Sequence, residues 1–110
     1  MSILNNKVAI VSGAGSGIGR AIAITYAAEG AKVVVADINE EHANETVSLI
    51  KDNGGEAIAI KADSSKAEEN KRLVEETVNQ YGRLDIAAIM QEWVVLRNQQ
   101  EIMSQKSGIG

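Results

Sequence analysis

The residues best suited to chemistry lie between Val8 and Arg20, where the sequence reads VAIVSGAGSGIGR. An apolar run suited to a strand buried on both faces precedes the glycines, and small and apolar residues at helical spacing follow them. The first N–H groups of a helix have no partner within it and lie at the positive end of the helix dipole, where they stabilise an anion. The pattern therefore predicts a strand, a turn and a helix that together bind a phosphate group, above all a pyrophosphate.

Five residues of this turn are expected around the pyrophosphate, namely Gly13, Ser16, Gly17, Ile18 and Gly19. Gly13 can adopt the positive φ of a tight turn. Gly17 and Gly19 lack the Cβ that would keep the pyrophosphate or the neighbouring strand at a distance. Each of the three glycines therefore has its own function in the predicted turn.

The spacing of the glycines distinguishes this turn from other nucleotide sites. It is Gly-x-x-x-Gly-x-Gly, which is neither the common G-x-G-x-x-G nor a Walker loop, because no Gly-Lys-Ser/Thr follows. Residues 12–19, SGAGSGIG, closely resemble the TGxxxGIG turn of the short-chain dehydrogenase/reductase family, with a serine in the place of the threonine. The alternative is a glycine-rich loop that binds no ligand.

A second candidate contact with a nucleotide is Asp37, which ends the predicted strand KVVVAD, 18 residues after Gly19. An acidic side chain at this place can accept hydrogen bonds from the 2′- and 3′-hydroxyls of the adenosine ribose, and it would repel a 2′-phosphate. The sequence therefore favours NAD over NADP as the cofactor. The alternative is that Asp37 caps the helix expected near Asn39, although Asn39 is itself an available cap.

A third candidate is Asp63, which follows the predicted strand EAIAIKA. In the family that the glycine turn resembles, an aspartate at this place hydrogen-bonds the adenine amino group, and the resemblance implies the same role for Asp63. Ser65 and Glu68 have the spacing of a capping box and predict that the next helix starts there. The two interpretations are compatible.

These candidates need a frame of alternating strands and helices. Strands are predicted at residues 7–12, 32–37, 56–62 and 84–90, and helices at about 18–29, 39–53 and 70–81. Right-handed crossovers then give a three-layer α/β, Rossmann-type parallel sheet in the order 3-2-1-4, with the cofactor across the carboxyl ends of the strands. The fourth strand keeps a free edge in this arrangement, and a free edge invites pairing with another chain, so we expect a homo-oligomer.

The resemblance covers residues 5–86 and fails at Ala87. Residues 81–86, YGRLDI, are similar to the family's usual approach to its fourth strand, but Ala-Ala-Ile-Met follows where the family has Asn-Asn-Ala-Gly. We therefore expect residues 1–110 to form a single, incomplete dinucleotide-binding domain that is truncated or internally deleted after about residue 86. Residues 1–90 would be its Rossmann half, and residues 91–110 a tail in which a strand and a helix are both possible.

The resemblance implies chemistry that this chain does not itself carry. The family uses a serine and a Tyr-x-x-x-Lys pair, in which the tyrosine is the general acid/base and the lysine lowers its pKa. Neither tyrosine fits, because Gly30 lies four residues after Tyr26 and Asp85 lies four after Tyr81. We expect the cofactor-binding half of an NAD-dependent oxidoreductase acting on an alcohol or carbonyl, with no catalytic residue. The alternative is a non-catalytic nucleotide-binding or interaction module.

The composition excludes several other classes. The chain has no cysteine, which rules out disulfides, thiol catalysis and cysteine-ligated metals, and its formal net charge of −4 gives no reason to expect nucleic acid or an anionic membrane as a partner. His42 lies among Glu40, Glu41 and Glu45 on what reads as a solvent-exposed helix face, so no catalytic role is expected for it. No metal site is predicted. The start, MSILNNK, does not resemble a secretion signal, and a cytoplasmic location is expected.

Overall fold

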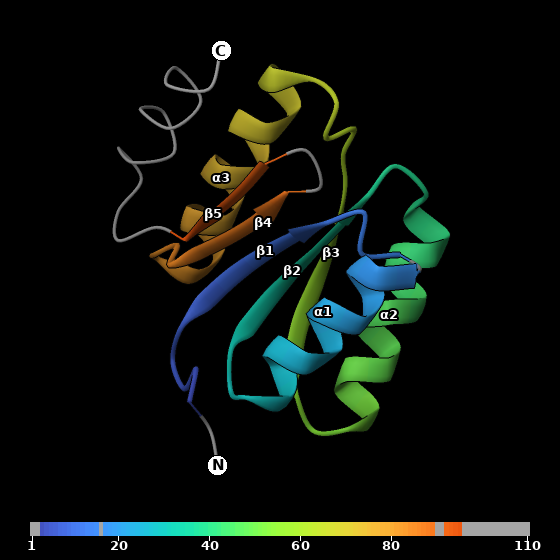
Figure 1. Cartoon of the computed structure of the whole chain (residues 1–110), viewed down its shortest axis with the longest axis vertical. Helices are drawn as coiled ribbons and strands as arrows, with labels where there is room; N and C mark the ends of the chain where they lie inside the picture. The colour runs from blue at the N-terminus through green and yellow to red at the C-terminus, as the bar shows by residue number, and fades with distance from the viewer. Residues whose placement is uncertain (1–2, 16, 90–91, 96–110) are drawn as a thin grey trace.

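The computed structural model describes residues 3–15, 17–89 and 92–95 of the chain (Figure 1). Its strands are β1 (Val8–Ser12), β2 (Lys32–Asp37), β3 (Glu56–Lys61), β4 (Ile86–Ile89) and β5 (Glu92–Val95), and its helices are α1 (Gly17–Ala28), α2 (Glu40–Asp52) and α3 (Ala67–Tyr81). The strands form one sheet in the order β3-β2-β1-β4-β5. No helix in the described part of the chain is long and apolar enough to cross a membrane.

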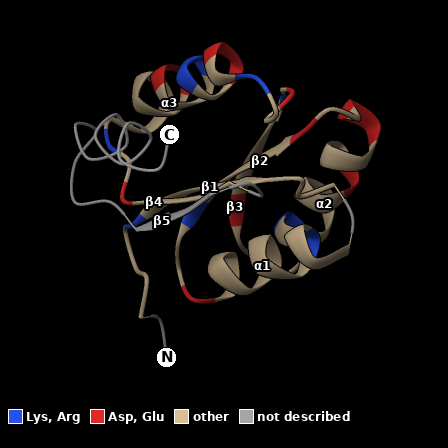
Figure 2. Ribbon diagram, turned by 45° about the horizontal axis from the view of Figure 1, so that its top comes forward, with Lys and Arg blue, Asp and Glu red and all other residues tan. Residues whose placement is uncertain are grey.

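The first four strands run parallel, which confirms the predicted order 3-2-1-4. Each pair of consecutive parallel strands is joined by a helix, because parallel neighbours need a long crossover connection. Helices α1 and α2 lie on one face of the sheet and α3 lies on the other (Figure 2). The molecule therefore has the three layers that the sequence predicts.

The prediction of a free edge on β4 is wrong. Strand β5 pairs with β4 in the antiparallel sense, with Ala87 opposite Val94 and Ala88 opposite Trp93. Only two residues separate these strands in the sequence, and so short a connection allows an antiparallel neighbour but no parallel one. Of the two interpretations left open for the start of the tail, the strand is the one that the structure has at residues 92–95.

Strand β2 shows why the sheet is the centre of the fold. Val33 and Val35 pack in the cluster beneath α1 and α2, whereas Val34 packs in the cluster beneath α3. Successive side chains of a strand point to opposite faces, and all three valines are fully buried. A strand that is buried on both sides needs an unbroken apolar run, which is what its sequence supplies.

The start of α3 differs from the prediction. The helix begins at Ala67, with Lys66 as an N-cap that makes no side-chain cap hydrogen bond. The capping box predicted for Ser65 and Glu68 is therefore wrong, because the Ser65 hydroxyl donates instead to a carboxylate oxygen of Asp63, at 2.6 Å. The remaining ends of the helices and strands lie within two residues of the prediction.

The start of α2 settles what caps it. Asn39 is the N-cap, and its side-chain oxygen accepts the N–H of His42 at 3.0 Å. Asp37 lies two residues earlier, at the end of β2, and does not cap the helix. Its carboxylate is therefore available for contacts at the carboxyl edge of the sheet.

Candidate functional site

The glycine turn between β1 and α1 has the geometry that the sequence predicts. Gly13 and Gly17 have φ values of 64° and 60°, in the left-handed region that favours glycine. Helix α1 starts at Gly17, and its first turn carries no acidic residue that would oppose a bound anion. Ser16, the other residue expected at this turn, lies outside the described residues.

Gly19 and Gly17 are needed for different reasons. A Cβ on Gly19 would overlap the carbonyl oxygen of Gly13, so the absence of a side chain lets α1 start directly against the end of β1. Apart from its chain neighbours and its own helix, no atom of the described residues lies within 4 Å of a Cβ placed on Gly17, so its positive φ is what requires glycine there. Ile18, between them, is 72% exposed.

Asp37 lies against this turn. One of its carboxylate oxygens, Oδ2, accepts the N–H of Gly15 at 2.8 Å, and the other, Oδ1, accepts the N–H of Asn39 at 2.9 Å. The end of β2 is thus tied to the turn that follows β1, as expected where parallel strands end at one edge of a sheet. The structure brings together the predicted pyrophosphate and ribose positions.

Gly15 is a site residue that sequence reasoning missed. A Cβ there would lie 2.7 Å from Oδ2 of Asp37 and 2.7 Å from Cβ of His42, so only glycine allows the carboxylate to approach the turn. The contact joins residues 22 positions apart. No local sequence pattern predicts this contact, because it depends on the register between β1 and β2.

Side chains of α1 and α2 hold the outer side of the turn. The buried hydroxyl of Thr46 donates to the carbonyl of Ala14 at 2.8 Å and accepts Nε of Arg20 at 2.9 Å. The guanidinium of Arg20 also donates to the carbonyl of Gly15 and pairs with Glu45 at 3.1 Å. Two carbonyls of the turn, those of Ala14 and Gly15, therefore accept hydrogen bonds within the protein.

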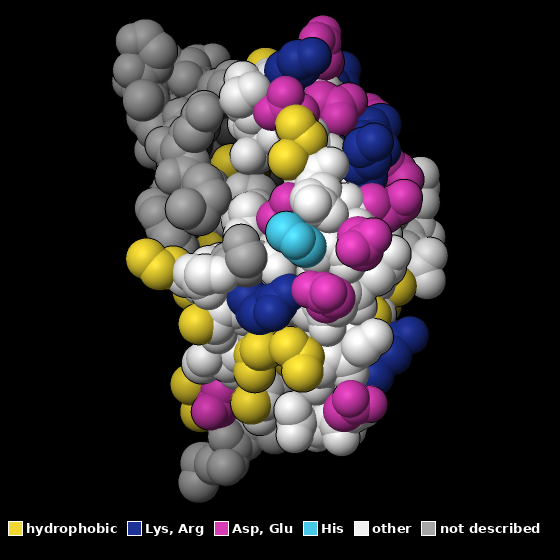
Figure 3. All heavy atoms as spheres, turned by 90° about the vertical axis from the view of Figure 1, so that its right-hand side faces the viewer, with side chains coloured by type: hydrophobic (Ala, Val, Ile, Leu, Met, Phe, Trp, Pro, Cys, Tyr) yellow, Lys and Arg dark blue, Asp and Glu magenta, His cyan; other side chains and the backbone are white. Residues whose placement is uncertain are grey.

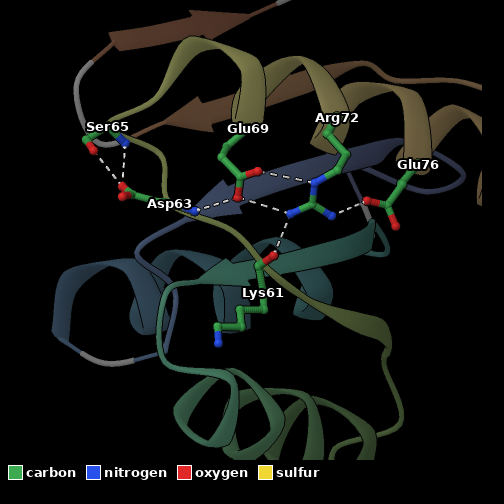
Figure 4. Close-up of polar contacts among 6 residues, drawn as sticks. All are labelled: Lys61, Asp63, Ser65, Glu69, Arg72 and Glu76. Atoms are coloured by element: carbon green, nitrogen blue, oxygen red, sulfur yellow. Dashed lines mark hydrogen bonds and ion pairs between the residues drawn. The ribbon is translucent and has the colours of Figure 1, made fainter.

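Asp63 follows β3, next to the end of β2. The N–H of Ala62 donates to the carbonyl of Asp37 at 3.1 Å, so the two strand ends lie side by side. Oδ1 of Asp63 accepts the Ser65 hydroxyl at 2.6 Å and the Ser65 N–H at 3.0 Å (Figure 4). These hydrogen bonds, the hydroxyl's first, and the charge of Lys66 lower the pKa of Asp63 despite a small opposing effect of desolvation. The carboxylate is ionised at neutral pH.

Ile38 is a second residue that the sequence reasoning passed over. It follows Asp37 directly at the end of β2, and its side chain is 62% exposed. It therefore presents an apolar surface to solvent next to the predicted ribose contact. The signal in the sequence was an isoleucine immediately after the acidic residue that ends β2.

The surroundings of the site are electrostatically mixed. On the face of the molecule that carries α2, acidic and basic side chains intermingle without an extended basic patch (Figure 3). Within the described ranges, no three histidine, aspartate or glutamate side chains gather closely enough to hold a metal ion.

Comparison with known proteins places these features in context. A family model described as short chain dehydrogenase matches residues 7–90. An uncharacterized oxidoreductase of Thermotoga maritima is 51% identical over 80 residues, which cover 73% of this chain and 31% of that protein. The 7alpha-hydroxysteroid dehydrogenase of Escherichia coli K12 is 45% identical over 83 residues, covering 76% and 32%. Cyclohexanol dehydrogenase of an Acinetobacter species is 47% identical over 83 residues, covering 76% and 33%.

A solved structure shows the same fold. The crystal structure of hydroxysteroid dehydrogenase from Escherichia coli matches with a TM-score of 0.74 at 44% identity, over 76% of this chain and 36% of that one. The chain thus spans about a third of the length of the curated relatives it matches. The match lies on the strands and helices that build the glycine turn and its two acidic neighbours.

Proposed function

The chain belongs to the short-chain dehydrogenase family, and on that basis we propose that it binds NAD as the cofactor-binding half of an oxidoreductase acting on an alcohol or carbonyl. Members of this family bind nicotinamide dinucleotides. The observation that carries the proposal is the contact between the Asp37 carboxylate and the N–H of Gly15, at 2.8 Å. This hydrogen bond holds the residue proposed to bind the ribose next to the turn proposed to bind the pyrophosphate.

The glycine turn fits a pyrophosphate. Gly13, Gly17, Ile18 and Gly19, with Ser16, would surround it, because the positive end of the α1 dipole and the free N–H groups of the first turn attract an anion.

The choice of NAD over NADP follows from Asp37. Its carboxylate is fixed by two backbone N–H groups, and the acceptor sites that remain suit the ribose 2′- and 3′-hydroxyls. A 2′-phosphate would bring a second negative charge against this carboxylate. We therefore propose that NADP binds much more weakly than NAD.

The adenine end of the cofactor is assigned to Asp63 and Ile38. The carboxylate of Asp63 would accept a hydrogen bond from the adenine amino group, while the exposed face of Ile38 would pack against the ring. Both residues stand where β2 and β3 end together.

When bound, NAD supplies hydride acceptance, and the residues of this chain hold and orient it. The relatives named above include dehydrogenases of a hydroxysteroid and of cyclohexanol, and each of these substrates carries a hydroxyl group. We therefore propose an alcohol or the corresponding carbonyl as the substrate class. Neither Tyr26 nor Tyr81 has a lysine four residues later, so this chain alone should bind NAD without turnover.

The second candidate is a non-catalytic nucleotide-binding module. The observation that favours it is the replacement of the family's Asn-Asn-Ala-Gly segment by Ala87, Ala88 and the residues that follow. Here the two alanines are buried in β4 and offer the cofactor no polar group. A module of this kind would bind a nucleotide without catalysis or would serve only as an interaction surface.

Two experiments test the proposal. Calorimetric titration with NAD and NADP measures binding, and incubation of the chain with NAD and a panel of secondary alcohols measures turnover. Saturable NAD binding, NADP binding at least about tenfold weaker, and no growth in NADH absorbance are expected. Absence of any NAD binding would refute the proposal, and turnover would refute the statement that the chain lacks the chemistry.

Self-association and a cytoplasmic location belong to the same proposal. Within the described residues, β5 and not β4 is the outermost strand at this end of the sheet. A short edge strand can still template pairing with a second copy. Sedimentation at high concentration tests this, and a single monomeric species would contradict it.

A further inference from the structure

The first turns of α3 contact the loop after β3 through three side chains. The guanidinium of Arg72 donates to the carbonyl of Lys61 at 2.8 Å, and the carboxylate of Glu69 accepts the N–H of Asp63 at 3.3 Å (Figure 4). The amide of Asn70 donates to the carbonyl of Ser64 at 3.1 Å. Three main-chain groups around Asp63 are thus held from one helix.

Arg72 is itself fixed at the centre of this network. It pairs with Glu69 at 3.2 Å, one turn before it, and with Glu76 at 2.5 Å, one turn after it. A planar guanidinium that meets two carboxylates and a carbonyl has little freedom to rotate. Glu69 in turn is shared between Arg72 and the N–H of Asp63, so the network is continuous from Glu76 to the loop.

The network contributes more to geometry than to stability. The side chains of Arg72, Glu69 and Glu76 remain 41%, 29% and 44% exposed, and ion pairs with this much solvent contact stabilise a fold only slightly. The end of β3 is held independently, because Ala62 is buried and its N–H donates to the carbonyl of Asp37. The fold therefore does not need Arg72 to place the strand.

The network does restrain the residue that would meet the adenine. Lys61 and Asp63 flank Ala62, and each has a main-chain group bound by α3. Both hydrogen bonds from Ser65 end on Oδ1 of Asp63. The second carboxylate oxygen can accept a hydrogen bond from a ligand. Main-chain and side-chain restraints together set the direction of that carboxylate.

We infer that Glu69 and Arg72 are positioning residues for the adenine end of the cofactor: they hold the main chain on both sides of Ala62 so that Asp63 meets the adenine amino group. The inference rests on the proposed function, since it names residues that prepare the same site. Prepositioning a group before binding raises affinity because less order is lost on association.

The test compares NAD with nicotinamide hypoxanthine dinucleotide, in which a keto oxygen replaces the adenine amino group. Both are titrated into the unaltered chain and into Arg72→Ala, Glu69→Gln and Arg72→Lys. The unaltered chain should prefer NAD, and Arg72→Ala should reduce that preference about three- to tenfold, the size of one well-placed hydrogen bond. Arg72→Lys, which keeps the charge, should restore part of it.

Arg83→Ala is the matched control. Arg83 also forms an ion pair on the surface, with Asp85 at 2.7 Å, but it does not contact the loop after β3. It should leave the preference for NAD unchanged. A general weakening of the fold would lower affinity for both dinucleotides equally and would not alter their ratio.

A double-mutant cycle with Asp63→Ala identifies the route of the effect. If Arg72 acts through Asp63, Arg72→Ala should change the ratio in the unaltered chain and should not change it further in Asp63→Ala. An additive result would overturn the inference.

The remaining outcomes separate the two proposals. An unchanged ratio in Arg72→Ala, with NAD still preferred by the unaltered chain, overturns the inference and leaves the proposed function standing. Equal binding of both dinucleotides by the unaltered chain also overturns the inference, because Asp63 then makes no contact with the amino group. Absence of any binding overturns the proposed function and the inference with it. Circular dichroism shows whether the variants fold; if Arg72→Ala unfolds, Glu69→Gln carries the test, and unfolding of both overturns the positioning role.

Discussion

The two sides of β1 differ in what they contribute. On one side, β2 and β3 run parallel to it and carry Asp37 and Asp63 at their carboxyl ends. On the other, β4 pairs with β1 from Ala9 to Val11 and then with the antiparallel β5, and neither strand carries a candidate cofactor contact. We refer to these as the β2–β3 side and the β4–β5 side.

The proposed cofactor contacts and the strands at the other end of the sheet thus occupy separate parts of the molecule. The contacts assigned to the dinucleotide lie between Gly13 and Asp63, with α3 holding the loop that follows β3. On the β4–β5 side, Ala87 and Ala88 are buried, and Asp85, directly before β4, accepts the N–H of Val8 at the start of β1 at 2.9 Å. Changes on the two sides should therefore separate affinity from stability.

The largest effect is expected from Gly19→Ala. The added Cβ would overlap the carbonyl of Gly13, so the turn must shift, at a cost of about 1–3 kcal/mol in the free energy of unfolding. NAD binding should be lost, because the shifted N–H groups of the turn would no longer converge on the pyrophosphate. Urea unfolding and calorimetry measure the two quantities. Gly54→Ala is the control: an alanine at its φ of 84° would be strained, but Gly54 lies after α2, so the change should leave NAD affinity intact.

Asp37→Asn should have the next largest effect. It keeps the shape of the side chain but loses the charge and one of the two acceptor oxygens that bind the N–H groups of Gly15 and Asn39. Hydrogen bonds to a charged group contribute about 1.5–3 kcal/mol, which corresponds to a fall in NAD affinity of about 10- to 150-fold. The loss of charge repulsion should at the same time bring NADP affinity closer to that for NAD. Fluorescence titration measures the affinity for each cofactor. If the ratio of NAD affinity to NADP affinity were the same in Asp37→Asn as in the unaltered chain, the role proposed for Asp37 would be wrong.

Ala87→Val tests the β4–β5 side. Ala87 is fully buried in the cluster beneath α3, so two extra methyl groups should lower the free energy of unfolding by about 1–3 kcal/mol. NAD affinity should not change at a temperature where the variant is folded. A loss of NAD affinity as large as that expected for Asp37→Asn would contradict the prediction that the β4–β5 side affects stability and not binding.

Ser65→Ala should have the smallest effect. Removing the hydroxyl takes away the largest cause of the lowered pKa of Asp63, so its pKa should rise toward the ordinary value of 3.8. A carboxyl group whose pKa falls on folding stabilises the folded state above its unfolded-state pKa and loses that contribution as the pH drops through the folded value. The variant should therefore show a smaller loss of stability below pH 3.8.

An NMR titration of the carboxyl carbons measures this directly. Asp85 serves as the internal control on the β4–β5 side. Burial would raise its pKa, but hydrogen bonds from Arg83 and from the N–H of Val8 lower it, and Ser65 touches none of these groups. An unmoved Asp63 titration in Ser65→Ala would contradict the assignment.

Local sequence signals identified the strands and helices of the β2–β3 side. The glycine turn, the valines of β2 and the helical spacing of α1 to α3 indicated these elements, from which right-handed crossovers predicted the parallel order 3-2-1-4, and the positive φ of Gly13 was foreseen from its place in the turn. These features are set by residues close together in the chain, where backbone conformation and periodicity decide the structure.

Features that depend on distant partners could not be predicted. A short apolar run such as Val94 and Val95 suits a strand or a helix, and only pairing with β4 decides between them. The Ser65 hydroxyl could accept a backbone N–H as a helix cap or donate to a nearby oxygen, and in the structure it donates to Asp63. Gly15 gained its importance from Asp37, across the register of two strands.

A crystal structure of the chain in complex with NAD would show whether the cofactor binds at the glycine turn. We predict the pyrophosphate at the N-terminus of α1 between Gly13 and Gly19, and the adenosine ribose hydroxyls on the carboxylate of Asp37. Dinucleotide bound on the β4–β5 side, or a glycine turn that stays empty at saturating NAD, would contradict the account.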